Sequence, residues 1–153
     1  MPNTFSKMYA QCVFAVKYRK SLIEPEWGKE FFAVIGNLIK ENECDVLIVN
    51  GVADHVHCLL RFYPKISISN VMQGAKSKSS KWVNETGYLK NRFEWQGGFG
   101  CFTYSEREIE RIFRYIENQE EYHKKISFRE EYLAMLIAHN IEFDPKFLFH
   151  DPI

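Results

Sequence analysis

Residues 45–62 read DVLIVNGVADHVHCLLRF, and this stretch decides the fold. It holds two short apolar runs, Asp45 to Val52 and Val56 to Phe62, that are broken near Asn50-Gly51. Apolar runs of this length on either side of a turn dipeptide predict a strand, a turn and a second strand. We therefore expect a β-hairpin here and interpret the rest of the chain around it.

The sequence on either side of the hairpin alternates between strand and helix patterns. Met8 to Tyr18 is β-branched and aromatic, as strands are, and the apolar residues after Pro25 recur at the spacing of one helix face. A second helix is expected from Ile68 to Val83, with Ser67 or Ser69 capping its start. The later elements are a glycine-rich loop and short strand over Trp95 to Tyr104, a helix from Ser105 to about Lys125 opened by an S-x-x-E capping box, and a tail helix from Glu130 to His139.

The order of elements is β-α-β-β-α-β-α followed by a short C-terminal extension, which predicts an α+β fold. Split βαβ halves of this kind form an antiparallel sheet with helices on one face, the ferredoxin-like or RRM-like arrangement. No repeat or linker divides the 153 residues, so we expect a single domain, residues 1–153, with a core of about 5–125 and an extension of about 126–153. Because this architecture serves enzymes and RNA-recognition domains alike, it does not decide the function.

The composition is that of a globular protein, with 46% hydrophobic and 26% charged residues. The chain does not open with a charged and then apolar leader, and no apolar run approaches the ~18 residues that span a bilayer. The four cysteines lie far apart without a C-x-x-C pair, which favours reduced thiols. These features predict a cytoplasmic protein.

The formal net charge of zero conceals two basic segments. Residues 1–23 hold four basic residues and no acid, and residues 61–92 hold seven basic residues and one acid. Such segments attract a polyanion within about a Debye length, ~8–10 Å, although a basic helix face is often simply solvated. The residues expected to contact nucleic-acid phosphates are Lys17, Arg19, Lys20, Arg61, Lys76, Lys78 and Lys81.

A histidine pair begins the second strand of the predicted hairpin. In the segment His55-Val56-His57 the two histidines are residues i and i+2, so on a strand they project from the same face. Two parallel imidazoles provide half of a site for a divalent metal ion. The alternative is a pair of surface or hydrogen-bonded histidines, and the motif alone leaves that alternative open.

The helix expected after Ser105 carries a second pair of candidate residues. Tyr115 and Gln119 are i and i+4, which makes them neighbours on one side of a helix, beside the apolar stripe. A phenol above a carboxamide oxygen would place a nucleophile beside a metal ion that the carboxamide helps to bind. The alternative is a half-buried tyrosine at the rim of the helix and an exposed glutamine, and spacing alone favours it.

The two motifs together resemble those of the single-tyrosine HUH transposases. His55-Val56-His57 matches the motif of histidine, bulky hydrophobic residue and histidine, and the sequence YIENQ at 115–119 matches the Y-x-x-x-Q helix. The resemblance is to the insertion-sequence 200/605 type, including the REP-associated tyrosine transposases. It runs from about Phe5 to Lys125 and does not imply a role for the tail.

The resemblance implies an enzyme that cuts and rejoins single-stranded DNA at hairpin-flanked ends. Tyr115 would be the nucleophile that forms a 5′-phosphotyrosine, and His55, His57 and Gln119 would bind Mg²⁺ or Mn²⁺. Asp54, the nearest acid, would orient His55 or belong to the turn. No nucleotide cofactor is expected, because the covalent ester conserves the bond and the chain lacks a G-x-x-x-x-G-K-[ST] loop.

The resemblance also implies partners. The expected nucleic acid is single-stranded DNA with a hairpin, and the expected assembly is a homodimer whose active sites are shared between subunits. Two other functions remain open at this point. One is a ferredoxin-like module that binds single strands without chemistry, and the other is a domesticated single-strand endonuclease.

Overall fold

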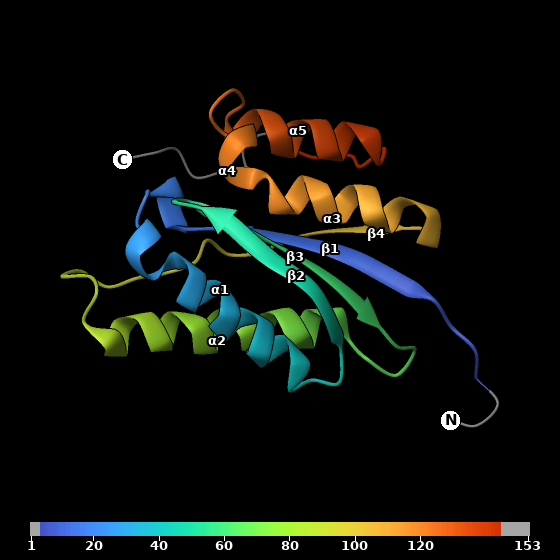
Figure 1. The fold of residues 1–153 in the computed structure, drawn as a ribbon, viewed down its shortest axis with the longest axis horizontal. Helices are drawn as coiled ribbons and strands as arrows, with labels where there is room; N and C mark the ends of the chain where they lie inside the picture. The colour runs from blue at the N-terminus through green and yellow to red at the C-terminus, as the bar shows by residue number, and fades with distance from the viewer. Residues whose placement is uncertain (1–3, 145–153) are drawn as a thin grey trace.

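The computed structural model describes residues 4–144 and contains one antiparallel sheet (Figure 1). The strands lie in the order β2-β3-β1-β4, and helices pack against the sheet. This arrangement confirms the predicted α+β class. The strand bounds are β1 Met8–Ala15, β2 Asp45–Val52, β3 His55–Phe62 and β4 Gly100–Tyr104.

The hairpin predicted at residues 45–62 forms, but its turn is not at Asn50-Gly51. Both residues lie inside β2, opposite His57 and Val56, and the turn falls at residues 53–54. Glycine is required at position 51 because the two strands approach closely there. A Cβ atom on Gly51 would overlap the carbonyl oxygen of His55. The glycine therefore marks a close strand contact and not a reversal of the chain.

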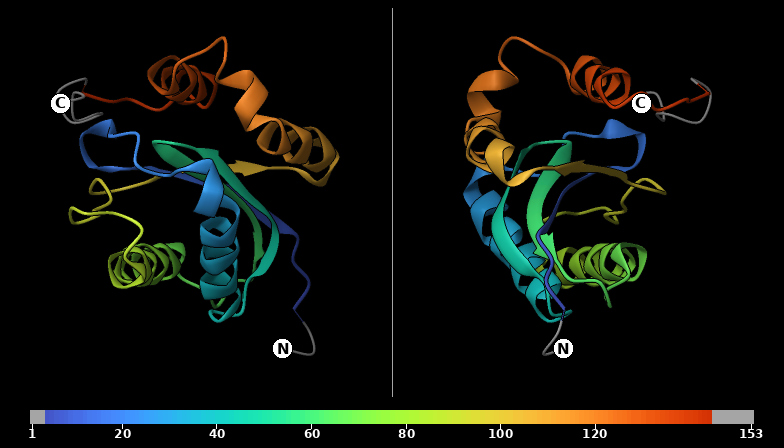
Figure 2. Two further views of the ribbon diagram at one scale, coloured as in Figure 1. Left: turned by 60° about the vertical axis from the view of Figure 1, so that its left-hand side comes forward. Right: turned by 90° about the vertical axis from the view of Figure 1, so that its right-hand side faces the viewer.

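Two helices cover one face of the sheet and enclose the main core (Figures 1 and 2). They are α1, Pro25–Lys40, and α2, Ile68–Thr86. Proline at the first position suits α1, and the Ser67 side chain accepts a hydrogen bond from the Asn70 amide at 3.3 Å, as the sequence predicted for α2. The largest completely buried side chains of this core are those of Phe31, Phe93, Ile35, Ile39, Leu60 and Met72.

The second face of the sheet is covered as well, so the expectation of helices on one face only was wrong. Helices α3, Ile109–Glu117, α4, Gln119–Tyr122, and α5, Phe128–Ala138, lie on this side (Figure 2). The reason is that several strand residues facing this side are also apolar. Val13 and Phe102 are buried with Phe128, and Leu59 is buried with Ile112 and Ile116.

The first strand ends at Ala15 and not at Tyr18 as predicted. Residues Lys17–Arg19 form a 3₁₀ turn, η1, in which Tyr18 and Arg19 have positive φ angles of 59° and 50°. The Val16 amide is bonded to the carbonyl of Asp54 at 2.8 Å, so the chain leaves the sheet while still tied to the hairpin turn. The basic KYRK segment is therefore a turn at the end of β1, an inner strand of the sheet.

The predicted helix from Ser105 to about Lys125 is divided into shorter pieces. Its capping box of Ser105 and Glu108 is present, and a 3₁₀ turn, η2 (Glu106–Glu108), leads into α3. The helix then breaks at Asn118, whose φ and ψ are −96° and 22°. The Asn50 side chain satisfies the last carbonyls of α3 by donating to those of residues 116 and 117 at 2.9 and 3.2 Å.

The tail helix predicted at Glu130–His139 is α5, which begins two residues earlier after Ser127, whose side chain caps it. Residues 145–153 of the predicted extension lie outside the described part.

Cys12, Cys44 and Cys58 are buried and Cys101 is exposed, and all four are free thiols. Within residues 4–144, no helix has the length and apolar character needed to cross a membrane.

The close contact at Gly51 makes a testable prediction. We expect Gly51→Ala to lower the free energy of unfolding by at least about 2 kcal/mol, because the new methyl group meets backbone that cannot give way. The control is Gly74→Ala in α2, where an added Cβ has no neighbour within 4 Å, so that about 0.5–1 kcal/mol of stabilisation is expected. Urea unfolding of both variants measures the difference. Equal stability of the two variants would contradict the close packing of β2 on β3.

Candidate metal centre and nucleophile

The two histidines of the H-x-H motif lie side by side on the sheet face that α3 to α5 cover. His55 and His57 pair with Ala15 and Val13 of β1, and both side chains are completely buried. Their ring centroids are 5.1 Å apart. The same-face placement that the strand period predicted is therefore present, and neither histidine is a surface residue.

Hydrogen bonds behind each ring fix which nitrogen carries the proton. Nδ1 of His55 lies 2.7 Å from a carboxylate oxygen of Asp54, and Nδ1 of His57 lies 2.6 Å from Oε1 of Gln11. The Gln11 amide is itself oriented, because its Nε2 donates to the Tyr104 hydroxyl at 2.9 Å. These oxygens only accept, and they lie closer to Nδ1 than Glu131 lies to Nε2, at 3.1 and 3.3 Å, so a neutral ring that bonds them carries its proton on Nδ1. The Nε2 lone pairs then face inward.

Two further residues complete this group, and the sequence did not predict either. His123 directly follows α4, and its Nδ1 lies 2.7 Å from the Ile126 carbonyl oxygen, which repeats the pattern of the other two rings. Glu131 of α5 is buried with 1% of its side chain exposed. Its Oε1 lies 3.0 Å from Nε2 of His123, 3.1 Å from that of His57 and 3.3 Å from that of His55.

The group has the chemistry of a cation site. Gln119, also fully buried, brings Oε1 within 3.0 Å of the Nε2 atom of His123 and 3.3 Å of that of His55. Where the rings are neutral, nitrogen and oxygen lone pairs converge with no proton between them, which is repulsive unless a cation, either a metal ion or a proton on a ring, lies there. His55, His57, His123 and Glu131 offer ligand atoms within 4.8 Å of one another and could hold a metal ion. Imidazole and carboxylate ligands suit a divalent transition-metal ion such as Mn²⁺.

Tyr115 lies next to this group. Its hydroxyl donates a hydrogen bond to Oε2 of Glu131, and Nε2 of Gln119 donates to the same oxygen at 3.1 Å. The Tyr115 ring packs edge-on against His57, with centroids 5.8 Å apart. A cavity of about 540 Å³ between α3 and α5 is lined by Tyr115 and Glu131 and continues toward Arg111 and His139. The phenol is therefore half-buried beside an opening.

Charge and burial act against each other within the group. Burial raises the pKa of Glu131, but hydrogen bonds with His55 and His57 outweigh it and hold the carboxylate pKa below its usual value. Burial lowers the pKa of His55, yet Asp54 and Glu131 outweigh burial and raise it. For His57 burial prevails and lowers the pKa, and for His123 burial and the charge of His55 lower the pKa to about 4.

A signal for Glu131 was present in the sequence. Phe128, Glu131 and Met135 are spaced as one face of a helix, so an acid stands at a position where an apolar residue is expected. An acid on such a face is almost never fully buried without a partner, which makes it a candidate ligand. His123 has a weaker signal. It stands four residues after Gln119, and residues at this spacing on a helix lie on the same side.

The predicted DNA-binding residues are divided between the ends and faces of the sheet. Lys17, Arg19 and Lys20 belong to or follow η1, which lies at the sheet end that carries the histidines (Figure 1). Lys78 and Lys81 are exposed on α2, which covers the other face. Arg61 lies at the far end of β3 and donates to the Ser6 carbonyl at 3.1 Å.

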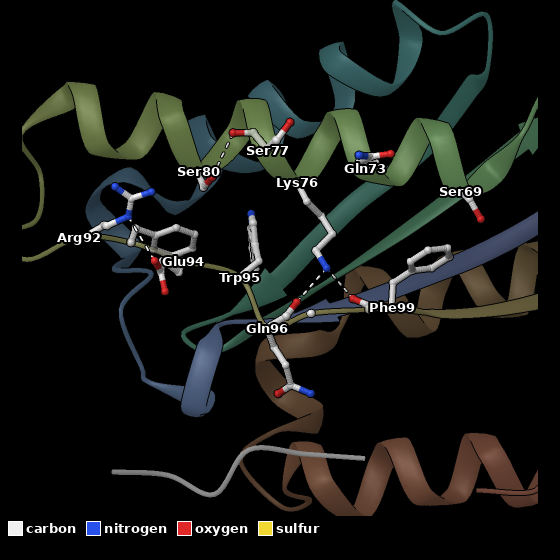
Figure 3. Close-up of a pocket in the computed structure, with 13 residues that line it drawn as sticks. Ser69, Gln73, Lys76, Ser77, Ser80, Arg92, Glu94, Trp95, Gln96 and Phe99 are labelled. Carbon is white, nitrogen blue, oxygen red and sulfur yellow. Dashed lines mark hydrogen bonds and ion pairs between the residues drawn. The ribbon is translucent and has the colours of Figure 1, made fainter. Parts of the chain in front are cut away.

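Lys76 has a defined structural role in a second cavity, of about 460 Å³, between α2 and residues 92–99 (Figure 3). Its ammonium donates to the carbonyl oxygens of Gln96, at 2.8 Å, and Gly98. Burial lowers the pKa of this half-buried amine. Lys76 thus holds the glycine-rich loop that leads into β4, and contact of this residue with DNA stays a prediction.

With this geometry established, comparisons with known proteins identify the family. The family described as IS200-like transposases matches residues 4–119, which is well over half of the chain. This chain belongs to the IS200-like transposase family. The match takes in both histidines of the motif, Tyr115 and Gln119, and it ends before His123 and Glu131.

Individual transposases agree with this assignment. The transposases for insertion sequence element IS200 of Salmonella typhimurium and Salmonella typhi are each 33% identical over 112 residues, covering 70% of this chain and 73% of theirs. The ISDra2 transposase TnpA of Deinococcus radiodurans is 25% identical over 112 residues, covering 70% of this chain and 80% of its own length.

Solved transposase structures share the fold. A Deinococcus radiodurans protein described as a candidate transposase has a TM-score of 0.63 at 23% identity, covering 76% of this chain and 94% of its own. A REP-associated tyrosine transposase bound to a REP hairpin has a TM-score of 0.61 at 13% identity, covering 81% of this chain and 73% of its own. At these identities the likeness establishes the fold alone.

The contact of Asp54 with His55 makes a second prediction. Removing the negative charge with Asp54→Asn should lower the pKa of His55, because that charge stabilises the protonated ring. The control, Asp45→Asn, makes the same charge change at the other end of the hairpin and should leave the His55 pKa unchanged. NMR titration of the imidazole signals in the presence of a chelator measures both. An unchanged His55 pKa in Asp54→Asn would show that the carboxylate does not support this ring.

Proposed function

We propose that this protein cuts and rejoins single-stranded DNA beside hairpins, with Tyr115 as the nucleophile and a divalent metal ion as cofactor. The observation that carries the proposal is the position of the Tyr115 hydroxyl. It bonds to one oxygen of Glu131, while the other oxygen of the same carboxylate meets the Nε2 atoms of three histidines. A nucleophile and a cation site therefore lie on either side of one carboxylate.

The chain's own residues provide for the covalent step. The Tyr115 oxygen forms a bond to the phosphorus of the scissile phosphate, and the bond from phosphorus to the 3′ oxygen breaks. The phenol proton passes to Glu131, which already accepts its hydrogen bond, and the 3′ oxygen takes a proton from water. The products are a 5′-phosphotyrosine and a free 3′-hydroxyl. Rejoining reverses the step with a new 3′-hydroxyl and needs no nucleotide cofactor.

His55, His57 and Gln119 are the residues proposed to hold Mg²⁺ or Mn²⁺, and Asp54 and Gln11 would fix the orientation of the two rings. A divalent cation held there would offset the charge of the phosphate and would stabilise the developing 3′ oxyanion. The inward Nε2 atoms and the Gln119 carboxamide oxygen support this assignment. The buried walls of the site reduce competition from water for the same phosphate.

The proposed substrate is a single strand next to a hairpin. The similar fold of the transposase bound to a REP hairpin supports this class of substrate. Lys17, Arg19 and Lys20 are proposed to bind phosphates near the active site, because η1 lies at the histidine end of the sheet. Lys78 and Lys81 on α2 and Arg61 on β3 would contact the same DNA only if it wraps around the sheet. Each neutralised phosphate adds about −0.7 to the salt dependence of single-strand binding.

The homodimer with shared active sites stays a prediction of the family resemblance. Within one chain, Tyr115 already lies beside His57, and Glu131 links the tyrosine to the histidines. These contacts support an active site that is completed within each chain.

The first functional prediction concerns the nucleophile. Tyr115→Phe should still bind hairpin DNA but should form no covalent adduct, because it lacks the attacking oxygen. Tyr122→Phe is the control and should form the adduct like the wild type. The Tyr122 ring packs against that of Tyr115, with centroids 5.3 Å apart, and the change keeps this aromatic contact. A denaturing gel with labelled single strands and Mn²⁺ measures the adduct.

Two results would contradict the proposal. If Tyr115→Phe forms the adduct as well as the wild type, the nucleophile is another residue. If the wild type binds the cognate hairpin ends and Mn²⁺ but never forms an adduct, the protein is a binding module without chemistry.

The next prediction distinguishes a site within one chain from a shared site. Tyr115→Phe and His57→Ala are each expected to be inactive, and a mixture of the two should remain inactive if each chain uses its own tyrosine and histidines. Recovery of cleavage in the mixture, after time for subunit exchange, would show that the tyrosine of one subunit serves the histidines of another. Adduct formation on the denaturing gel again gives the measurement.

A further inference from the structure

Helix α5 places an acid at the centre of the histidine group, although it lies beyond the residues that the transposase family matches. The family match ends at residue 119, and α5 begins at Phe128. Glu131 nevertheless makes contacts with all three histidines, with Gln119 and with Tyr115. The part of the chain that the family motifs do not include therefore provides the central group of the site.

The surroundings of Glu131 are those of a metal ligand and not of a structural ion pair. Its ion-pair partners among the described residues are the three histidines, and no lysine or arginine is among them. A buried carboxylate without a cation is costly.

A divalent cation balances the charges of this group. Three neutral imidazoles carry no charge and the carboxylate of Glu131 carries one negative charge, so a divalent ion would leave a net charge of one positive. The carboxylate of Asp54, which lies behind His55, compensates that charge. All three imidazoles hold their Nδ1 against an oxygen acceptor, which leaves the same nitrogen, Nε2, for the ion in each. His123 shares this geometry with the H-x-H pair, and Oε1 of Glu131 lies where the three Nε2 atoms meet.

We propose that Glu131 and His123 are ligands of the metal ion together with His55 and His57, and that the ion thereby fastens α5 over the nucleophile. The inference rests on the proposed function and adds two ligands and a structural effect to it. The position of α5 supports it, because Phe128, in the first turn of the helix, stacks on the His55 ring with centroids 4.0 Å apart. Metal binding would therefore order the tail of the enzyme as well as its active site.

Contacts away from the site hold α5 only in part. Phe128 and Leu136 are buried against Val13, Ala15 and Phe102, but the outer side of the helix exposes 68% of Ile137. The linker between α4 and α5 carries Lys124 and Lys125, both exposed. Trypsin can therefore report how firmly α5 is held, because cleavage at these lysines requires the linker to leave the surface.

The test measures metal binding and protection from trypsin without DNA. Calorimetric titration with MnCl₂ compares the wild type with Glu131→Gln, which keeps the shape of the side chain and removes its charge. We expect affinity at least about tenfold weaker, since even outer partners of metal ligands contribute that much. Glu130→Gln is the matched control, because it makes the same change at an exposed neighbour in the same helix and should bind Mn²⁺ like the wild type. Mn²⁺ should slow cleavage at Lys124 and Lys125 in the wild type and in Glu130→Gln, but not in Glu131→Gln.

The outcomes separate this inference from the proposed function. If Glu131→Gln, folded by circular dichroism, binds Mn²⁺ as tightly as the wild type while His57→Ala does not, the histidine site stands and the role of Glu131 is wrong. If Mn²⁺ leaves the trypsin cleavage of the wild type unchanged, the fastening of α5 is wrong. If the wild type binds no Mn²⁺, the metal-dependent mechanism fails together with the inference. A second variant, His123→Gln, should also weaken Mn²⁺ binding, and wild-type affinity would exclude His123 as a ligand.

Discussion

The convergence of three imidazole nitrogens on one buried carboxylate oxygen is the constraint on which the rest of this site depends. Each Nδ1 is held by an oxygen acceptor, from Asp54, Gln11 or the Ile126 backbone, so each Nε2 presents a lone pair to Glu131. Lone pairs brought together in a buried site need a positive charge between them. The same carboxylate holds the Tyr115 hydroxyl, which joins the cation site to the proposed nucleophile.

The scaffold makes this convergence possible through two local features. The close contact at Gly51 lets β2 pair tightly with β3, the strand whose two-residue period puts His55 and His57 on one face. The Asn50 side chain of β2 donates to the last carbonyls of α3, so the hairpin also fixes the end of the helix that carries Tyr115 and leads to Gln119.

The sequence predicted the parts of the site that follow from local rules. Strand period placed His55 and His57 on one face, and the capping residues Ser67 and Ser105 marked true helix starts. The break at Asn118 was not predicted, and the Asn50 side chain that caps the end of α3 there lies far away in the chain. Glu131 was missed for a similar reason. Its partners come from β3, α4 and the segment after α4, and only tertiary structure brings them together.

This chain belongs to the IS200-like transposase family, and the chemistry that we propose for it depends on a cation at the centre of the histidine group. The most direct measurement is the anomalous diffraction from crystals of the full chain grown or soaked with Mn²⁺. A single anomalous peak at bonding distance from Nε2 of His55, His57 and His123 and from Oε1 of Glu131 is the predicted result. Two results would contradict a metal centre here. One is no peak at this position, and the other is a Mn²⁺ ion bound elsewhere while the histidines remain hydrogen-bonded to Glu131.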